Sequence, residues 1–346
     1  MFIELKAIYM RILLHGYNTC FQNESGGVQN RMRKIYTLLL SNNIDTTFFN
    51  PYDSRIKDFD VLHLFMLKAE TLPLIRLAKQ CGVKIVLSSI VNTINKFKIK
   101  TYNKFLNKLP IPTTYKLEYE AIHLVDCIIV ESLQESVFLQ QCYDVDSSKI
   151  YVIPNGVDES SYSGREIFTI VNKPKFLLQI GRFDENKNQL SVIKAIKKTD
   201  VEAVFIGGAD STSSEYYTKC QMEAKGFKNI HFLGWRDSDD PLFKSALAWA
   251  DTLILPSYYE TFGLVLLEAG VNGAKLVVSN TLPILDYKSF QGIPSFNPSN
   301  INDIYDKIMY TMSLEKDESV KERIISEFSW DAVIKQHINL YSDLLK

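Results

Sequence analysis

Two basic residues in the second half of the chain have the type and spacing to hold a phosphate group. Arg182 and Lys187 follow the apolar run 176–181, which predicts a strand, and Lys187 falls at the start of the next expected helix. A guanidinium binds phosphate through its planar fork and an ammonium binds it as a point charge, so both could converge on one anion. The alternative is that the two cations pair with Asp184 and Glu185 at the surface.

Two acidic residues spaced eight apart follow another predicted strand. Glu260 lies in a loop before Phe262, Gly263 and Leu264, and Glu268 lies within an aliphatic helix. A carboxylate in apolar surroundings is costly unless it is hydrogen-bonded, and sugar or ribose hydroxyls would be suitable donors. The free N–H groups that open this helix would face phosphate or sugar oxygens. The alternative is an ordinary acid at the helix N-terminus and a second acid at the surface.

A third group lies near the start of the chain, where a predicted strand gives way to a helix. Gly26 and Gly27 precede Val28 and Gln29 there. Paired glycines let the backbone approach a ligand closely, and the first N–H groups of a helix attract anions. A plain tight turn would explain the same residues.

The elements that must position these residues are strands and helices in alternation. Near-continuous apolar strands separated by helices indicate a parallel sheet covered on both faces, which is an α/β fold. The pattern restarts after Pro154-Asn155-Gly156, so we expect two doubly wound Rossmann-like domains, 1–157 and 158–328, with a polar linker at about 155–174. A final amphipathic helix, 329–346, is expected to pack back toward the first domain. The predicted strands are 11–16, 45–50, 60–65, 83–88, 127–131, 150–153, 176–181, 203–207, 230–233, 252–256 and 275–279.

Composition and charge limit the classes of function. The formal net charge is -1, so no global basic field indicates a nucleic-acid partner. The five cysteines have no zinc-type spacing and no Asp-x-Asp motif lies at the end of a predicted strand, so we expect no metal site. No stretch approaches the ~20 apolar residues of a membrane helix, and the cysteine pattern suits a reducing, cytoplasmic compartment.

The motifs GGVQ, VIPNGVD, IGRFDENKNQLSVIKAI and PSYYETFGLVLLEAG resemble, in this order, those of the retaining GT-B glycosyltransferases of family GT4. The closing SWDAVIKQHINLYSDLL is similar to that family's C-terminal helix, so the resemblance spans nearly the whole chain. It implies two Rossmann-like domains facing across a cleft. The nucleotide sugar would bind mainly to the C-terminal domain and the acceptor mainly to the N-terminal one.

The resemblance also implies roles for single residues. Arg182 and Lys187 match the pair that holds the donor diphosphate, Glu260 matches the acid on the donor sugar hydroxyls, and these three form the implied catalytic set. Glu268 matches the acid that holds the ribose, and the main chain at Trp235 falls where the base is usually read. The implied donor-binding set is Gly26, Gly27, Gly207, Gly208, Trp235, Phe262, Gly263, Leu264 and Glu268.

The sequence departs from the family on the acceptor side. Many members carry a His after the fourth strand, close to the reacting sugar, whereas residues 86–91 here contain none. A serine such as Ser89 or a backbone group is expected to substitute. His15 at the end of the first strand and Gln29 are the other acceptor-side candidates, although His15 suits a core or a turn equally well.

The resemblance and the missing metal motif together favour metal-independent, front-face transfer with retention of configuration. The donor would be a UDP- or GDP-linked hexose, with no cofactor besides it. The acceptor would be a saccharide or a lipid-linked sugar in bacterial surface polysaccharide or glycoconjugate synthesis. The alternatives are a GT-B nucleotide-sugar epimerase and a non-catalytic GT-B subunit that binds a partner enzyme.

One segment suggests a location for such an enzyme. Residues 96–108 hold five lysines and no acid, interleaved with aromatic and aliphatic residues. One interpretation is a solvated lysine face on a helix that packs on the N-terminal sheet. The other is a basic amphipathic surface that rests on the anionic inner face of the plasma membrane.

Overall fold

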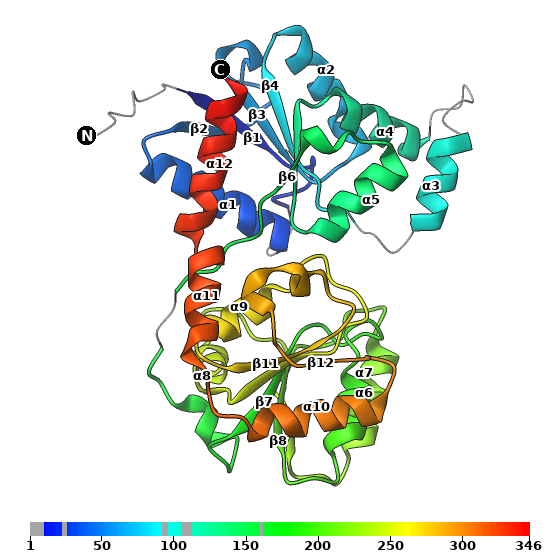
Figure 1. Cartoon of the computed structure of the whole chain (residues 1–346), viewed down its shortest axis with the longest axis vertical. Coiled ribbons are helices and arrows are strands. Elements are labelled where there is room, and N and C mark those ends of the chain that lie inside the picture. The colour runs from blue at the N-terminus through cyan, green and yellow to red at the C-terminus, as the bar shows by residue number, and fades with distance from the viewer. Residues whose placement is uncertain (1–9, 23–25, 92–95, 106–112, 160–161) are drawn as a thin grey trace. The chain divides into compact units, whose positions relative to one another are not determined.

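The structure is a computed structural model that describes residues 10–22, 26–91, 96–105, 113–159 and 162–346. The chain forms two compact units: unit 1 comprises residues up to Gly156 together with Trp330–Lys346, and unit 2 comprises Val157–Ser329. The boundary expected from the sequence lay after residue 157. Each unit is a parallel six-stranded sheet with helices on both faces, which confirms the predicted α/β class (Figure 1).

Unit 1 has the strand order β2-β1-β3-β4-β5-β6. Its strands are β1 (Arg11–His15), β2 (Asp45–Phe48), β3 (Val61–Phe65), β4 (Lys84–Ser88), β5 (Cys127–Val130) and β6 (Ile150–Val152). Its helices are α1 (Gly27–Ser41), α2 (Leu72–Gln80), α3 (Lys96–Phe105), α4 (Thr114–Leu124), α5 (Leu133–Tyr143) and α12 (Trp330–Leu344).

Alternate residues of the strands in unit 1 are buried in two separate hydrophobic cores. Ile12 and Leu14 of β1 face a core completed by α1 and α12, whereas Leu13 faces a core completed by α2, α4 and α5. Met32 and Ile35 of α1 are fully buried in the first of these cores because their spacing keeps them on one side of the helix. The C-terminal helix α12 therefore packs against the sheet of unit 1, although unit 2 precedes it in the sequence.

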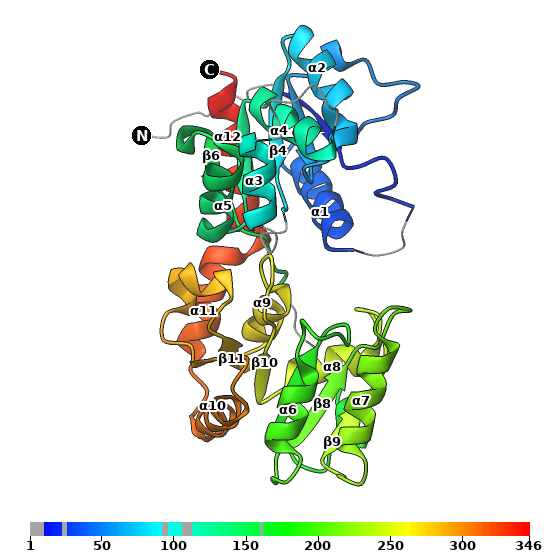
Figure 2. The same cartoon turned by 90° about the vertical axis from the view of Figure 1, so that its right-hand side faces the viewer.

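Unit 2 has the strand order β12-β11-β10-β7-β8-β9. Its strands are β7 (Phe176–Ile180), β8 (Glu202–Ile206), β9 (Ile230–Phe232), β10 (Thr252–Leu255), β11 (Lys275–Ser279) and β12 (Ser295–Phe296). Its helices are α6 (Gln189–Ile196), α7 (Ser214–Ala224), α8 (Pro241–Trp249), α9 (Leu264–Val271), α10 (Ile301–Ser313) and α11 (Glu318–Phe328). Figure 2 shows α6 and α7 side by side over β8.

Two features of unit 2 differ from the sequence analysis. The expected linker is part of the fold, because Ile167 and Val171 are buried in the same core as strands β7 and β10. Most residues of 155–174 are polar, which predicts a linker, and the two buried apolar side chains do not stand out in the sequence. The edge strand β12 was not predicted, since two residues are too few to show a period.

Candidate functional site

The sheet order of unit 2 brings two predicted groups of residues together. The chain runs from β7 outward through β8 and β9, then returns to place β10 on the other side of β7. Ligands of open α/β sheets bind beyond the carboxyl ends of the strands at such a reversal. The loops after β7 and β10 touch there: the Tyr258 N–H donates to the Asn186 carbonyl oxygen at 2.9 Å, and the Tyr259 N–H donates to the Asn186 side chain at 3.0 Å.

Lys187 and Glu260 meet at this point, although they are far apart in the sequence. The Lys187 Nζ donates to Glu260 Oε1 at 2.5 Å, and the Ser257 hydroxyl donates to the same oxygen at 2.5 Å. Both charged side chains are mostly buried, with 25% and 13% of the side-chain surface exposed. The surface alternative required the Lys187 ammonium to pair with Asp184 or Glu185. It pairs with Glu260 instead.

Arg182 shows the pairing that the surface alternative described. Its guanidinium is half exposed and donates to Asp184 Oδ2 at 2.8 Å and to Asp210 Oδ2 at 2.9 Å. The hydrogen bond to Asp184 is the main reason that the pKa of Arg182 is raised. The pKa of Asp210 is lowered to about 2, chiefly by the Thr212 hydroxyl and backbone N–H. The half-exposed Arg182 guanidinium thus bridges two partly buried carboxylates, and an incoming anion of higher charge can compete with them for it.

The glycines after β8 have steric reasons to be glycine. Gly207 has a φ of +134°, and a Cβ there would collide with the backbone carbonyl of Gly181, so the ends of β7 and β8 approach more closely than side chains allow. A Cβ on Gly208 would lie 2.6 Å from the indole nitrogen of Trp235. The Trp235 ring is 61% exposed, and its Nε1 donates to the Ala209 carbonyl at 3.4 Å. These predicted residues thus form one surface, beside Arg182.

The remaining predicted residues of unit 2 lie on or before helix α9. Gly263 caps the helix with a φ of +105° and no side-chain cap. The Leu266 N–H donates to the Gly263 carbonyl at 2.9 Å, and among the described residues the N–H groups of Leu264 and Val265 remain open to an acceptor. The Phe262 ring is buried against Tyr287 and does not face a ligand.

Glu268 is a carboxylate without a protein partner in the described part of the chain. It lies one turn into α9, it is partly buried, and burial raises its pKa. No hydrogen bond or ion pair to its carboxylate occurs among the described residues, and the Asn272 side chain donates only to the Glu268 backbone carbonyl, at 2.7 Å. Such a group is costly for the fold alone and is suited to accept hydrogen bonds from a ligand hydroxyl.

The donor-binding candidates Gly26 and Gly27 and the acceptor-side candidates Gln29 and His15 lie in unit 1. Gly26 caps α1 without a side-chain cap, and a Cβ on Gly27 would meet nothing within 4 Å. The buried Gln29 donates to the Tyr17 hydroxyl at 3.2 Å. Burial lowers the pKa of His15, whose ring packs edge-on against Phe49. The described residues of unit 1 thus give no steric reason for glycine at position 27.

Ser89 is not free to contact a ligand through its hydroxyl. Its side chain is fully buried and donates to Glu135 Oε1 at 2.7 Å. Sequence reasoning missed Glu135, although Ser132 three residues before it forms the start of a capping pattern that would have flagged it. It also missed Asp210 and Ser257, for which no local pattern gives a signal.

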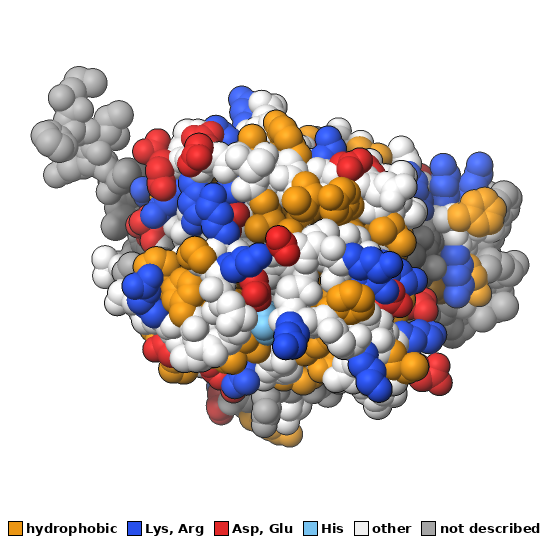
Figure 3. Space-filling model, turned by 90° about the horizontal axis from the view of Figure 1, so that it is seen from below, with side chains coloured by type: hydrophobic (Ala, Val, Ile, Leu, Met, Phe, Trp, Pro, Cys, Tyr) orange, Lys and Arg blue, Asp and Glu red, His pale blue; other side chains and the backbone are white. Residues whose placement is uncertain are grey.

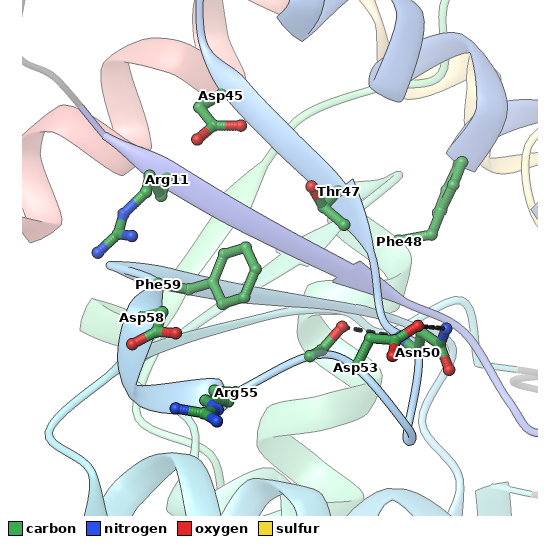
Figure 4. A pocket seen from close by; sticks show the side chains of 10 residues that line it. Arg11, Asp45, Thr47, Phe48, Asn50, Asp53, Arg55, Asp58 and Phe59 are labelled. Atoms are coloured by element: carbon green, nitrogen blue, oxygen red, sulfur yellow. Dashed lines mark hydrogen bonds between the residues drawn. The ribbon is translucent and has the colours of Figure 1, made fainter.

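Two hollows in the surface lie away from these residues. One of about 580 Å³ in unit 1 is lined by Arg11, Thr47 and Phe59 with several acids (Figure 4), and one of about 290 Å³ in unit 2 surrounds Lys275. Neither includes a predicted site residue. Among the described residues, no three His, Cys, Asp or Glu side chains gather as metal ligands do.

The surface shows no field of a single sign on the face in Figure 3, where basic and acidic side chains are interspersed. Helix α3 is more one-sided. Lys96, Lys98, Lys100 and Lys104 are exposed on it, as is Phe97 with 85% of its surface, while Ile99 packs inward. Residues 106–108 of the lysine segment lie outside the described residues. Within the described chain, no helix is long and apolar enough to cross a membrane.

Comparison with known families covers both units. Residues 8–161 match the family Glycosyltransferase Family 4, and residues 163–326 match the family Glycosyl transferases group 1.

Similar proteins include an uncharacterized glycosyltransferase of Methanocaldococcus jannaschii, 25% identical over 66% of this chain and 61% of that protein. A UDP-Gal:alpha-D-GlcNAc-diphosphoundecaprenol alpha-1,3-galactosyltransferase of Escherichia coli is 26% identical over 83% of this chain and 76% of that protein. The chain spans about three fifths of the length of the Methanocaldococcus jannaschii protein and of two other curated relatives that it matches.

Solved structures share the fold. HepE of Anabaena in complex with UDP superposes with a TM-score of 0.73 at 16% identity, over 96% of this chain and 100% of that one. Sucrose-phosphate synthase of Thermosynechococcus elongatus gives a TM-score of 0.72 at 16% identity, over 96% of this chain and 99% of that one.

Proposed function

The chain belongs to the GT4-type glycosyltransferases of GT-B fold, and from this premise we propose that it transfers a hexosyl group from a nucleotide-linked donor to a saccharide or lipid-linked acceptor. The observation that carries the proposal is the strand reversal of unit 2, where Lys187 meets Glu260 beyond the ends of β7 and β10. Helix α9, which follows β10, adds Glu268, whose carboxylate has no partner among the described residues. Of the two donor classes expected, UDP-linked sugars are favoured, since HepE binds UDP-glucose and the relative from Escherichia coli uses UDP-Gal.

In this proposal, the donor diphosphate takes the place of protein carboxylates around the two cations. A diphosphate carries more charge than a carboxylate, so it can draw Lys187 from Glu260 and Arg182 from Asp210. Glu260 is then free to accept hydrogen bonds from the hydroxyls of the donor sugar. Glu268 accepts them from the ribose, and the open N–H groups of α9 add a partial positive charge.

The proposed chemistry is front-face transfer with retention. The bond from the anomeric carbon to the diphosphate oxygen breaks, the bond to the acceptor oxygen forms on the same face, and the acceptor proton passes to the leaving oxygen. Arg182 and Lys187 stabilise the negative charge that develops on the leaving group, which is the task that fixed charges perform in a transition state. No divalent ion takes part in this scheme.

The experiment is an incubation of the protein with UDP-galactose or UDP-glucose and an α-GlcNAc-diphospho-lipid with a short alkyl chain, followed by chromatography and mass spectrometry. A product heavier by one hexose is expected, and NMR of its anomeric proton reports retention or inversion. Conversion of the donor to its epimer without acceptor would favour the epimerase alternative. Absence of both reactions, with UDP still bound, would favour the non-catalytic subunit.

We also propose that α3 holds the enzyme at the inner face of the plasma membrane, where a lipid-linked acceptor would be found. Its exposed lysines flank the exposed ring of Phe97, so charge and apolar surface lie on one short helix. Each lysine near an anionic surface contributes about 1 kcal/mol of attraction. Changing Lys98, Lys100 and Lys104 to Glu is expected to abolish sedimentation with phosphatidylglycerol liposomes at low salt.

The matched control reverses three exposed lysines of unit 2, Lys219, Lys225 and Lys228, and should sediment as wild type does. Equal loss in both variants would indicate non-specific charge attraction, and no binding by wild type at low salt would remove the membrane proposal. Either result leaves the transferase proposal in place.

A further inference from the structure

Two strained residues lie at the ends of neighbouring strands in unit 1. Among the described residues, five that are not glycine have a positive φ, and three of these are Asn or Asp, which tolerate it. The other two are Met66 with a φ of +76° and Ile90 with a φ of +44°. A β-branched residue such as Ile90 adopts this conformation only when its surroundings impose it.

The strained residues are on the ligand side of the sheet. Met66 follows β3 and Ile90 follows β4, both at the carboxyl ends where open α/β sheets bind ligands. The two ends are joined, since the Met66 N–H donates to the Ser88 carbonyl at 2.8 Å and the Leu67 N–H donates to the Ser89 carbonyl at 2.9 Å. Met66 and Ile90 both remain partly exposed. Strain at such a position is a reason to look for function.

One buried side chain imposes the conformation of the segment after β4. Glu135, near the start of α5, accepts hydrogen bonds at Oε1 from the Ser89 hydroxyl at 2.7 Å and from the Val91 N–H at 3.0 Å. Its other oxygen accepts from the Glu131 N–H at 2.8 Å. The carboxylate thus grips the residues on both sides of Ile90 and ties them to the end of β5.

The surroundings of Glu135 disfavour the charged form of its carboxyl group. Burial, and then the charge of Glu131, raise the pKa of Glu135 to about 7. Glu131 is itself paired with the buried Arg31 of α1, so the carboxyl groups here are packed among charges rather than solvent. The fold tolerates the buried carboxylate because three donors, the Ser89 hydroxyl and the Val91 and Glu131 N–H groups, satisfy its oxygens, and removing it leaves those donors unpaired.

We infer that Glu135 is a positioning residue of the acceptor site: it holds Ser89, Ile90 and Val91 at the end of β4 in the single strained conformation that the acceptor meets. The inference rests on the proposed function and goes beyond it, because it explains how this chain shapes a loop that lacks the family's histidine. Glu135 acts through the loop and touches neither donor nor acceptor. It should therefore affect the KM for the acceptor and leave the KM for the donor unchanged.

The test compares two carboxylates that accept hydrogen bonds at opposite ends of β4. Asp126 accepts from the Ile85 N–H at 2.8 Å, so it grips the amino end of β4 as Glu135 grips the carboxyl end. Glu135→Ala and Asp126→Ala are assayed with UDP-galactose and the short-chain α-GlcNAc-diphospho-lipid. Both should lower Tm, but only Glu135→Ala should raise the acceptor KM, by tenfold or more, with the donor KM within twofold of wild type.

Two further variants separate positioning from folding. Ile90→Gly removes the backbone strain, because glycine adopts a positive φ freely, so it should keep the wild-type Tm. It also lets the segment adopt other backbone conformations, so it should still raise the acceptor KM. Glu135→Gln retains one acceptor oxygen and should recover part of the loss. An acceptor KM that changes equally in Glu135→Ala and Asp126→Ala, or in neither, would overturn the inference.

A separate readout distinguishes this inference from the proposed function. If wild type transfers no sugar, the proposed function fails, and hydrogen exchange of the Val91 amide then tests the grip directly. That amide should exchange at least tenfold faster in Glu135→Ala and at the wild-type rate in Asp126→Ala. Unchanged exchange in Glu135→Ala would show that Glu135 does not hold the segment.

Discussion

Replacing Glu268 with glutamine should make the free protein more stable and its binding of UDP weaker. The carboxylate is partly buried and has no partner in the described part of unit 2, so removing its charge relieves a desolvation cost. A buried group left without a hydrogen bond costs about 1–3 kcal/mol, and partial exposure places Glu268 at the lower end, near ~1 kcal/mol. For a domain of the size of unit 2, that corresponds to a rise in Tm of roughly 2–4 °C at neutral pH.

The loss of binding follows from the same group. Hydrogen bonds to a charged partner contribute about 1.5–3 kcal/mol, so a ribose that loses the Glu268 carboxylate should bind about 10- to 150-fold more weakly. Thermal shift without ligand and isothermal titration with UDP measure the two effects separately. A rise in Tm together with a fall in UDP affinity is informative, because a variant that merely damages the fold lowers both Tm and UDP affinity.

The pH dependence gives a third check on Glu268. Its pKa in the folded protein is raised, so its contribution to stability is present below its ordinary pKa and is lost as pH rises through the folded value. The advantage of Glu268→Gln over wild type should therefore be small at low pH and grow with rising pH.

Glu223 is the matched control with the opposite sign. Its hydrogen bond from Lys197 lowers its pKa, so its stabilising effect is present above its ordinary pKa and is lost as pH falls. Glu223→Gln should lower Tm at neutral pH and leave UDP binding unchanged. The reasoning is refuted if Glu268→Gln melts below wild type at neutral pH, or if it binds UDP as wild type does.

Three further results are expected. Arg182→Ala and Lys187→Ala should each lower kcat at least ~100-fold in the chromatographic transfer assay with Tm little changed, and near-normal turnover in both would contradict their role at the diphosphate. Transfer should continue in excess EDTA, whereas loss that magnesium or manganese restores would show that a metal is required. Gly207→Ala should destabilise unit 2 by about 2 kcal/mol or more in urea unfolding, because the new Cβ meets the Gly181 carbonyl at a φ that alanine resists, and an unchanged midpoint would refute the close approach of β7 and β8.

Several features of this protein were determined by short stretches of sequence. Each predicted strand corresponds to an observed one because apolar runs of strand length are local signals that do not depend on the neighbours in the sheet. The buried face of α1 follows in the same way from the spacing of Met32, Ile35 and Leu39.

The pairings of the charged side chains were decided only by the tertiary structure. Lys187 meets Glu260 across 73 residues because the sheet places β10 beside β7, and no pattern in either loop encodes that neighbour. Arg182 likewise reaches Asp210 through the close approach of β7 and β8. Ser89 was expected to face a ligand, but its hydroxyl turns inward to Glu135, which begins another helix. Local periodicity specifies which residues are buried, whereas the order of strands in the sheet specifies which loops become neighbours, and the chemistry of the site depends on the second of these.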